Sequence, residues 1–172
     1  MLTPLVMTLI GPDRTGLVEN VARTVAEYGG NWLESRMCRL GGEFAGILRI
    51  EIPEEKKAAL LAALHAVPNL NVVGRPDEKA VATTGTCQTK LEIVGSDRPG
   101  IVRDITSALV RARVNVEEFS SEVISAPMSG ETLFKAAARL QLPADCDLAT
   151  LKQDLEKIAA DLLVDVSFGE IQ

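Results

Sequence analysis

Apolar residues recur along this chain with two different periods. Residues 3–10 form a mostly apolar run rich in β-branched side chains, which is typical of a buried strand. Residues 17–28 place apolar side chains at helical spacing with polar ones between them, which predicts an amphipathic helix over one sheet face. Gly29 and Gly30 end that helix. The chain therefore begins with a strand followed by a helix.

The same two patterns continue to the end of the chain and give the order βαββαβ twice. Gly41-Gly42 marks a tight hairpin in the first half, and residues 125–130 form a longer hairpin loop in the second. The predicted strands are 3–10, 31–40, 44–52 and 70–73, then 90–94, a strand opened by Asn115, 134–142 and 164–168. The predicted helices are 17–28, 54–67, 101–112 and 148–162.

An internal repeat supports this division. The stretch from Gly11 to Gly16 returns as Gly95 to Gly100, and 95 − 11 gives an offset of 84. Asn31 and Asn115, which open the second strand of each half, have the same offset. Right-handed crossovers then predict an α+β fold of two ferredoxin-like βαββαβ domains, each an antiparallel sheet with both helices on one face. We place the domains at residues 1–76 and 87–172, joined by a polar linker at 77–86.

The composition of the chain limits the classes of function that we expect. Hydrophobic residues make up 47% of the chain, aromatic residues 3%, and the formal net charge is −6. An acidic chain with few aromatics lacks the basic surface of a nucleic-acid binder or a peripheral membrane helix. It has no apolar run of membrane-spanning length and no signal peptide, so we expect a cytoplasmic protein. Two domains of this size have thin cores, which predicts packing between the halves or a homodimer.

Residues that could support catalysis are sparse. His65 is the single histidine and suits a surface or packing role, so no nucleophile-and-base pair can be assembled without it. Three widely spaced cysteines, Cys38, Cys87 and Cys146, are expected to be buried or half-buried thiols without a disulfide or zinc site. Glu117 and Glu118 are adjacent on a strand and should point to opposite faces. We expect a protein without enzymatic activity, metal or cofactor.

The repeated glycine-rich stretch is the main candidate site. It joins a strand to a helix, so its glycines permit a tight turn and its end presents the N–H groups of a helix start to a carboxylate or phosphate. It matches neither G-x-G-x-x-G nor a G-K-[ST] loop, which argues against a nucleotide. The alternative is a purely structural turn in which Asp13 and Asp97 cap the helices.

The doubled D-R-x-G turn, each followed by an asparagine at the second strand, resembles tandem ACT-domain regulators over essentially the whole chain. The resemblance implies a small amino acid effector, glycine or serine, bound at an interface between ACT domains near the turn after the first strand. It also implies action through a protein partner. The implied site residues are Gly11, Asp13, Arg14, Gly16, Leu17 and Asn31, and Gly95, Asp97, Arg98, Gly100, Ile101 and Asn115.

Within these sites, the resemblance implies that the backbone N–H groups of Leu17 and Ile101 hold the effector carboxylate. The aspartates and asparagines would meet its ammonium and amide groups. The two copies differ at their second and fifth positions, so one site could be vestigial. Two roles stay open: transcriptional control of glycine cleavage through a transcription activator, or direct control of a metabolic enzyme.

Overall fold

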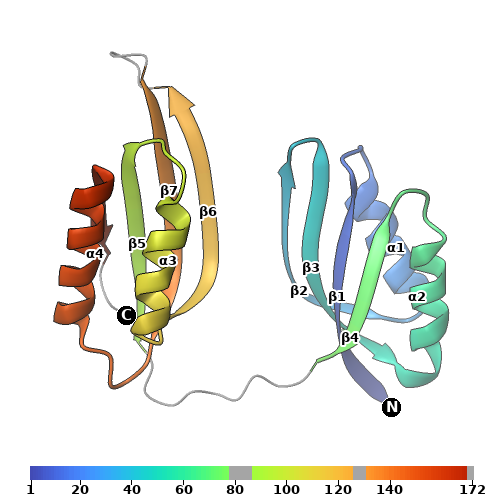
Figure 1. Cartoon of the computed structure of the whole chain (residues 1–172). Coiled ribbons are helices and arrows are strands. Elements are labelled where there is room, and N and C mark those ends of the chain that lie inside the picture. Colours follow the sequence, from blue (N-terminus) through green and yellow to red (C-terminus); the bar gives the residue numbers. More distant parts are fainter. Residues whose placement is uncertain (78–86, 126–130, 170–172) are drawn as a thin grey trace. The chain divides into compact units, whose positions relative to one another are not determined.

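The computed structural model describes residues 1–77, 87–125 and 131–169, and the chain divides into two compact units, Met1–Ala80 and Val81–Gln172. The first, called the N-unit here, contains β1 (Leu2–Pro12), α1 (Leu17–Glu27), β2 (Asn31–Leu40), β3 (Glu43–Pro53), a 3-10 turn (Glu54–Lys56), α2 (Lys57–His65) and β4 (Asn71–Pro76). The second, the C-unit, contains β5 (Cys87–Ser96), α3 (Ile101–Arg111), β6 (Asn115–Ser125), β7 (Thr132–Leu142), α4 (Leu148–Leu162) and β8 (Val164–Phe168) (Figure 1).

Each unit has one four-stranded sheet with the same topology. The strand order is β2-β3-β1-β4 in the N-unit and β6-β7-β5-β8 in the C-unit, and the recorded pairings are all antiparallel. Both helices of a unit cover the same sheet face and leave the other face open (Figure 1). The prediction of two ferredoxin-like βαββαβ units is therefore confirmed.

The core of each unit is aliphatic because the chain has few aromatic residues to fill it. Alternate residues of β1 and β3 point toward the helices, and α1 buries one side chain per turn against them. The C-unit repeats this pattern between β5, β7, α3 and α4. The fully buried large side chains include Leu5, Met7, Leu9, Leu48, Ile50, Ile52, Leu60 and Leu64 in the N-unit and Leu91, Ile93, Ile101, Ile105, Leu140 and Leu155 in the C-unit.

Several details differ from the sequence-based expectation. The helix expected at 54–67 begins as a 3-10 turn, and β5 runs from Cys87 to Ser96 rather than from 90 to 94. Apart from Asp77 and Ser125, the expected linker at 77–86 and the hairpin loop at 125–130 lie outside the described residues, so the linker bounds stay a prediction. Within the part of the chain that is described, no helix is long and apolar enough to cross a membrane.

A β-bulge interrupts the second strand of both units at equivalent positions. The register shifts between Trp32 and Glu34 in β2, and between Val116 and Glu118 in β6. The expectation that Glu117 and Glu118 point to opposite faces is wrong, because the bulge breaks the alternation at Glu117. Both carboxylates instead contact the guanidinium of Arg139, at 3.2 Å and 3.1 Å.

Candidate functional site

The two glycine-rich stretches form strand-to-helix turns, called the N-corner (residues 11–17) and the C-corner (residues 95–101) here. In each, the last glycine adopts a left-handed conformation immediately before the helix, with φ of 84° at Gly16 and 99° at Gly100. A Cβ on Gly16 would meet no atom within 4 Å. The backbone conformation, and not a lack of space, therefore favours glycine at that position.

The first glycine of each corner has a different physical role. A Cβ on Gly11 would lie 2.5 Å from the backbone oxygen of Asn69, and a Cβ on Gly95 would lie 2.5 Å from Cα of Val164. Both glycines thus let the end of the central strand pass close to the connection between the second helix and the last strand. The structure accounts for Gly11 and Gly95 by packing inside the unit, without a ligand.

Neither corner helix is capped by a side chain. Gly16 and Gly100 occupy the N-cap positions of α1 and α3, and among the described residues no side chain caps either helix with a hydrogen bond. The interpretation of Asp13 and Asp97 as helix caps is therefore wrong. Helix α4 differs, because the Asp147 carboxylate accepts bonds from the N–H groups of Ala149 and Thr150 at 3.0 Å and 3.2 Å.

The backbone N–H groups at the starts of α1 and α3 are therefore partly available to a ligand. Leu17 donates its N–H to the carbonyl of Arg14 at the long distance of 3.3 Å, and the first regular helical bond runs from the Asn20 N–H to the Gly16 carbonyl. In α3 the matching bond runs from the Asp104 N–H to the Gly100 carbonyl. The side chains of Leu17 and Ile101 are buried and anchor the helix starts in the two cores. Each corner thus presents an uncapped helix start with its partial positive charge.

The aspartates are held by the neighbouring hairpin. The N–H of Asp13 donates to the Gly42 carbonyl at 2.8 Å, and its carboxylate pairs with Arg39 at 2.6 Å. In the C-corner the N–H of Asp97 donates to the Thr132 carbonyl at 3.0 Å. The residue 84 positions after Arg39 is Val123, so Asp97 has no arginine at the equivalent position. Sequence reasoning missed Arg39, because its place beside Asp13 depends on the β2–β3 hairpin and not on local spacing.

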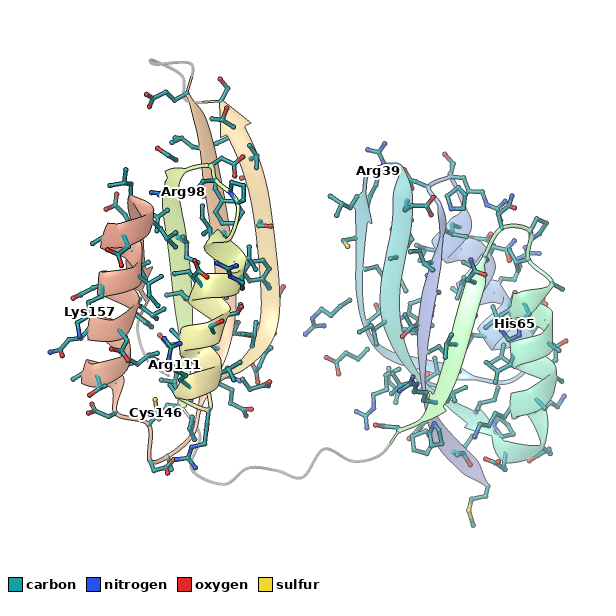
Figure 2. The ribbon with its side chains drawn as sticks, viewed as in Figure 1. Arg39, His65, Arg98, Arg111, Cys146 and Lys157 are labelled. Carbon is teal, nitrogen blue, oxygen red and sulfur yellow. The ribbon has the colours of Figure 1, made fainter. Side chains whose placement is uncertain are left out.

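The two corner arginines also differ. Arg14 is exposed, whereas Arg98 is half-buried, and its Nη2 atom is buried without a hydrogen-bond partner among the described residues. Figure 2 shows Arg39 and Arg98 at the corner ends of their units. In the N-corner the aspartate is therefore paired with an arginine. Among the described residues, the C-corner has a buried arginine nitrogen without a hydrogen-bond partner, and its aspartate lacks the arginine that Asp13 has.

In each unit the asparagine lies far from the corner. Asn31 pairs with Glu51, which pairs with Pro4 of β1, seven residues (11 − 4) from Gly11. Asn115 pairs with Gln141, which pairs with Gln88, again seven residues (95 − 88) from Gly95. Seven strand residues span about 24 Å. Asn31 and Asn115 are exposed at the opposite sheet end, so one amino acid cannot touch the corner and the asparagine of the same unit.

The three cysteines and the histidine lie outside the residues of the two corners. All three cysteines are free, but Cys38 and Cys87 are exposed, so the expectation of buried or half-buried thiols holds for Cys146 alone. Burial, followed by the nearby Asp147 and Asp145 carboxylates, raises the pKa of the Cys146 thiol, and Arg113 opposes this. His65 is exposed, and its Nε2 lies 2.6 Å from the Val72 carbonyl, a link between α2 and β4.

Comparison with known proteins identifies the fold family. The ACT domain family model matches residues 3–69 and 91–169, one match per unit. The chain belongs to the ACT domain family. The glycine cleavage system transcriptional repressor of Escherichia coli is 25% identical, over 92% of this chain and 85% of its own length.

Two further proteins are similar to this chain. The crystal structure of an unknown protein from Galdieria sulphuraria matches with a TM-score of 0.86 and 26% identity over 99% of both chains. A UPF0237 protein from Methanopyrus kandleri is 35% identical over 75 residues, which are 43% of this chain and 77% of its own. The tandem ACT architecture is therefore shared with a second protein along the whole chain.

Proposed function

We propose that this chain is a non-enzymatic regulatory protein that binds a small amino acid, glycine or serine, and passes the signal to a protein partner. The observation that carries the proposal is the pair of uncapped helix starts at the corners, in a chain whose α4 is capped. An effector carboxylate would accept bonds from these N–H groups and benefit from the helix dipole. The resemblance to a repressor named for the glycine cleavage system supports glycine metabolism as the setting.

The C-corner is the better candidate of the two. Its buried Arg98 Nη2 lacks a partner among the residues that the structure describes, and an unpaired buried donor costs about 1–3 kcal/mol. A carboxylate bound at that end would supply the missing acceptor. The Asp97 carboxylate, without an arginine at the position of Arg39, is free to meet an ammonium group. In the N-corner, Arg39 already neutralises Asp13.

If the asparagines take part, a second ACT domain must provide them. The distance of about 24 Å between corner and asparagine excludes a shared ligand within one unit. A homodimer would offer the corner of one copy to the asparagine of another, which fits an effector bound at an interface between ACT domains. Effector binding would then change how the copies associate, and this is the signal that a protein partner could detect.

Calorimetry against each of the twenty amino acids tests the effector. We expect heat from glycine or serine at modest affinity, and a matching rise in melting temperature because the ligand binds the folded state. Glycine amide and N-acetylglycine are the matched controls, since they lack the carboxylate or the ammonium group. Absence of heat and of any thermal shift with all twenty amino acids would contradict the proposal.

Affinity capture from the source cell, with and without the effector, tests the partner. A transcription activator among the captured proteins would support control of glycine cleavage, and a metabolic enzyme would support the alternative role. The net charge of −6 predicts no affinity of the chain itself for DNA. Tight, salt-sensitive binding to duplex DNA would contradict that part of the proposal.

A further inference from the structure

A hollow lies between the end of α3 and the start of α4 in the C-unit, and we call it the α3–α4 hollow. Its volume is about 340 Å³, at the lower end of the range for small-molecule sites. Figure 2 shows Arg111 and Cys146, which both line it, at the end of the C-unit away from Arg98. Arg111 lies ten positions after Ile101, which is about 15 Å along the helix. The hollow is therefore distinct from the C-corner and shares no residue with it.

The N-unit carries larger side chains at the equivalent positions of its first helix. The C-cap residue is Tyr28 in α1 and Ala112 in α3, with the same offset of 84. Tyr28 packs against the core of the N-unit, whereas Ala112 lines the hollow. One turn earlier, Thr24 of α1 corresponds to Ala108 of α3, which also lines the hollow. Two alanines in place of a tyrosine and a threonine thus leave room for the hollow in the C-unit.

The residue that follows each of these helices differs as well. Gly29 and Arg113 both have a left-handed backbone, with φ of 75° and 57°, and equivalent backbone hydrogen bonds close the two helices. Glycine adopts this conformation freely, but an arginine rarely does. Arg113 pairs with Asp145 at 2.5 Å, and both residues line the hollow. Uncommon backbone conformations gather at ligand sites, so this exchange of glycine for arginine indicates a role for the hollow.

The charged groups around the hollow are satisfied to different degrees. Asp145 is paired with Arg113, and the Asp147 carboxylate accepts hydrogen bonds from two N–H groups at the start of α4. Asp154 lies 3.9 Å from a lysine of its own helix. In the part of the chain that the structure describes, Arg111 has no ion-pair partner. The hollow can therefore offer a free guanidinium to a ligand.

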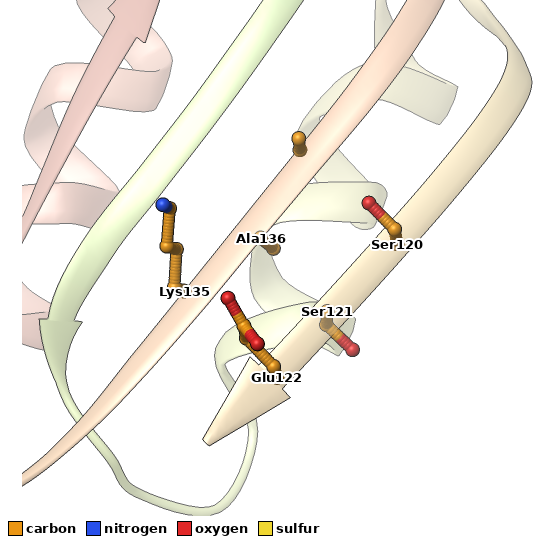
Figure 3. A pocket seen from close by; sticks show the side chains of 6 residues that line it. Ser120, Ser121, Glu122, Lys135 and Ala136 are labelled. Atoms are coloured by element: carbon orange, nitrogen blue, oxygen red, sulfur yellow. The ribbon is translucent and has the colours of Figure 1, made fainter. Parts of the chain in front are cut away.

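A depression on the open sheet face of the C-unit provides a contrast. Figure 3 shows Ser120, Glu122 and Lys135 around this depression of about 300 Å³. Small and charged side chains are what a sheet face in water normally carries, so they do not indicate a ligand. The α3–α4 hollow differs because buried apolar residues of two helices, Ala108 and Leu151, contribute to its lining. An apolar lining with a few polar groups is typical of a small-molecule site.

We propose that the α3–α4 hollow binds a small carboxylate whose apolar body is about the size of one aromatic ring. The apolar body lies against Ala108, Ala112 and Leu151, where its burial is favourable. The carboxylate accepts hydrogen bonds from the guanidinium of Arg111. A ligand this small makes few contacts, so we expect roughly millimolar affinity. The site goes beyond the proposed effector function and does not depend on it.

Alkylation of Cys146 by iodoacetamide tests the site, because this thiol lines the hollow. The probe is 4-hydroxyphenylacetate, which carries the ring of tyrosine and a carboxylate. At a saturating concentration it should slow the modification of Cys146 severalfold. Cys38 and Cys87 should keep their rates and serve as internal controls. Tyramine is the matched control probe, since it has the same ring with an ammonium group instead of the carboxylate, and it should not protect Cys146.

Calorimetry with the same probe tests which residues bind it. Arg111→Met removes the partner of the carboxylate and should weaken binding about tenfold or more. Ala112→Tyr places the side chain of the N-unit in the hollow and should abolish binding. Arg103→Met is the control on the same helix, because Arg103 pairs with Asp104 at the start of α3. It should leave the affinity unchanged, and circular dichroism verifies that each variant folds.

Protection of Cys146 by the carboxylate probe alone, together with weaker binding in Arg111→Met, supports the proposal. Absence of both protection and heat with the unchanged protein overturns it. Equal protection by tyramine, or equal effects of Arg111→Met and Arg103→Met, also overturns it. If Ala112→Tyr does not fold, Arg111→Met decides the outcome. The probe has no ammonium group and the hollow shares no residue with either corner, so a negative result here leaves the effector proposal standing.

Discussion

The Asp13 carboxylate lies 2.6 Å from Nε of Arg39, which fastens the N-corner to the β2–β3 hairpin. The backbone adds a second link, since the Asp13 N–H donates to the Gly42 carbonyl at 2.8 Å. Asp13 thus acts as a tether between the turn before α1 and the hairpin, and not as a helix cap. The C-corner keeps the backbone link, from Asp97 to Thr132, with Val123 at the position of Arg39.

This tether predicts small effects on stability. The Arg39 side chain is 68% exposed, and an exposed ion pair contributes about 0.2–1 kcal/mol. We expect Arg39→Ala and Asp13→Ala to lower the free energy of unfolding in urea by no more than that, with faster hydrogen exchange at the Asp13 amide. Arg36→Ala is the control, because its partner Glu34 lies on the same strand. A loss of about 2 kcal/mol or more in Asp13→Ala would mean that the aspartate contributes more than an exposed ion pair does.

The two glycines of the N-corner should respond differently to substitution. Gly11→Ala places a Cβ 2.5 Å from the Asn69 backbone oxygen, so the chain must shift at a cost of about 1–3 kcal/mol. Gly16→Ala meets no neighbour but holds a left-handed backbone, which costs about 1–2 kcal/mol. Asparagine tolerates that conformation, so Gly16→Asn should recover much of the loss in urea unfolding. Recovery by Gly11→Asn as well would contradict the steric explanation.

The sequence predicted the elements and both corners because their signals are local. Glycines, prolines and apolar periodicity act over a few residues, and the offset of 84 between Gly11 and Gly95 provided a second, independent copy of each signal. The role of Asp13 was not predictable in this way. It depends on Gly42 and Arg39, which reach the corner through hairpin pairing.

The arrangement of the candidate site was beyond local reasoning for the same reason. Asn31 follows α1 closely in sequence, but the helix runs back along the sheet and leaves it at the end opposite to Gly11. The exposure of Cys38 follows from its place on edge strand β2, and the shared contact of Glu117 with Arg139 follows from a bulge. Strand order and register decide all three features, and neither is encoded in a short window.

Cys146 should be the least reactive thiol of the three. It is half-buried, and burial with two nearby carboxylates raises its pKa, so less thiolate is present at pH 8. We expect slower alkylation by iodoacetamide at Cys146 than at Cys38 and Cys87, measured by mass spectrometry of the modified peptides. Raising the pH should increase its rate, because more of the thiol ionises. Equal rates at all three cysteines would contradict this prediction.

Loss of the Arg113 guanidinium should slow the alkylation of Cys146 further. Arg113 lowers the pKa of the thiol, so Arg113→Ala removes an opposing influence and raises that pKa more. Arg103→Ala is a control on the same unit, because Arg103 pairs with Asp104 at the start of α3, away from Cys146. Faster alkylation in Arg113→Ala would show that access, and not ionisation, limits the reaction.

Arg98 should matter for binding while Arg14 does not. Within the described part of the chain, the Nη2 of Arg98 is buried without a partner. Arg98→Met removes this unsatisfied donor and should leave the unliganded protein equally or more stable. Its affinity for the amino acid should fall about ten- to a hundredfold if the effector carboxylate is the missing acceptor. Arg14→Met, at the equivalent exposed position, is the matched control. Calorimetry and urea unfolding measure the two effects separately, and unchanged affinity in Arg98→Met would remove the C-corner from the site.

Asn31 and Asn115 provide the strictest test of the proposed site, because they lie far from the corner of their own unit. Loss of a hydrogen bond to a charged ligand group costs about 1.5–3 kcal/mol, so Asn115→Ala should weaken effector binding about ten- to a hundredfold. Both asparagines are exposed, so the melting temperature should change little. Weaker effector binding in Asn31→Ala, together with unchanged binding in Asn115→Ala, would assign function to the N-unit asparagine instead.

Mixing two defective variants shows whether a second copy provides the asparagine. Arg98→Met and Asn115→Ala each remove one half of the proposed C-unit site. If corner and asparagine come from different copies, a mixed dimer contains one intact site and one site with both defects. An equal mixture should then regain about a quarter of the sites at the original affinity, because half of the dimers are mixed and half of their sites are intact. If calorimetry of the mixture shows no recovery of binding, a site shared between copies is contradicted. The asparagines would then be features of the strand start alone.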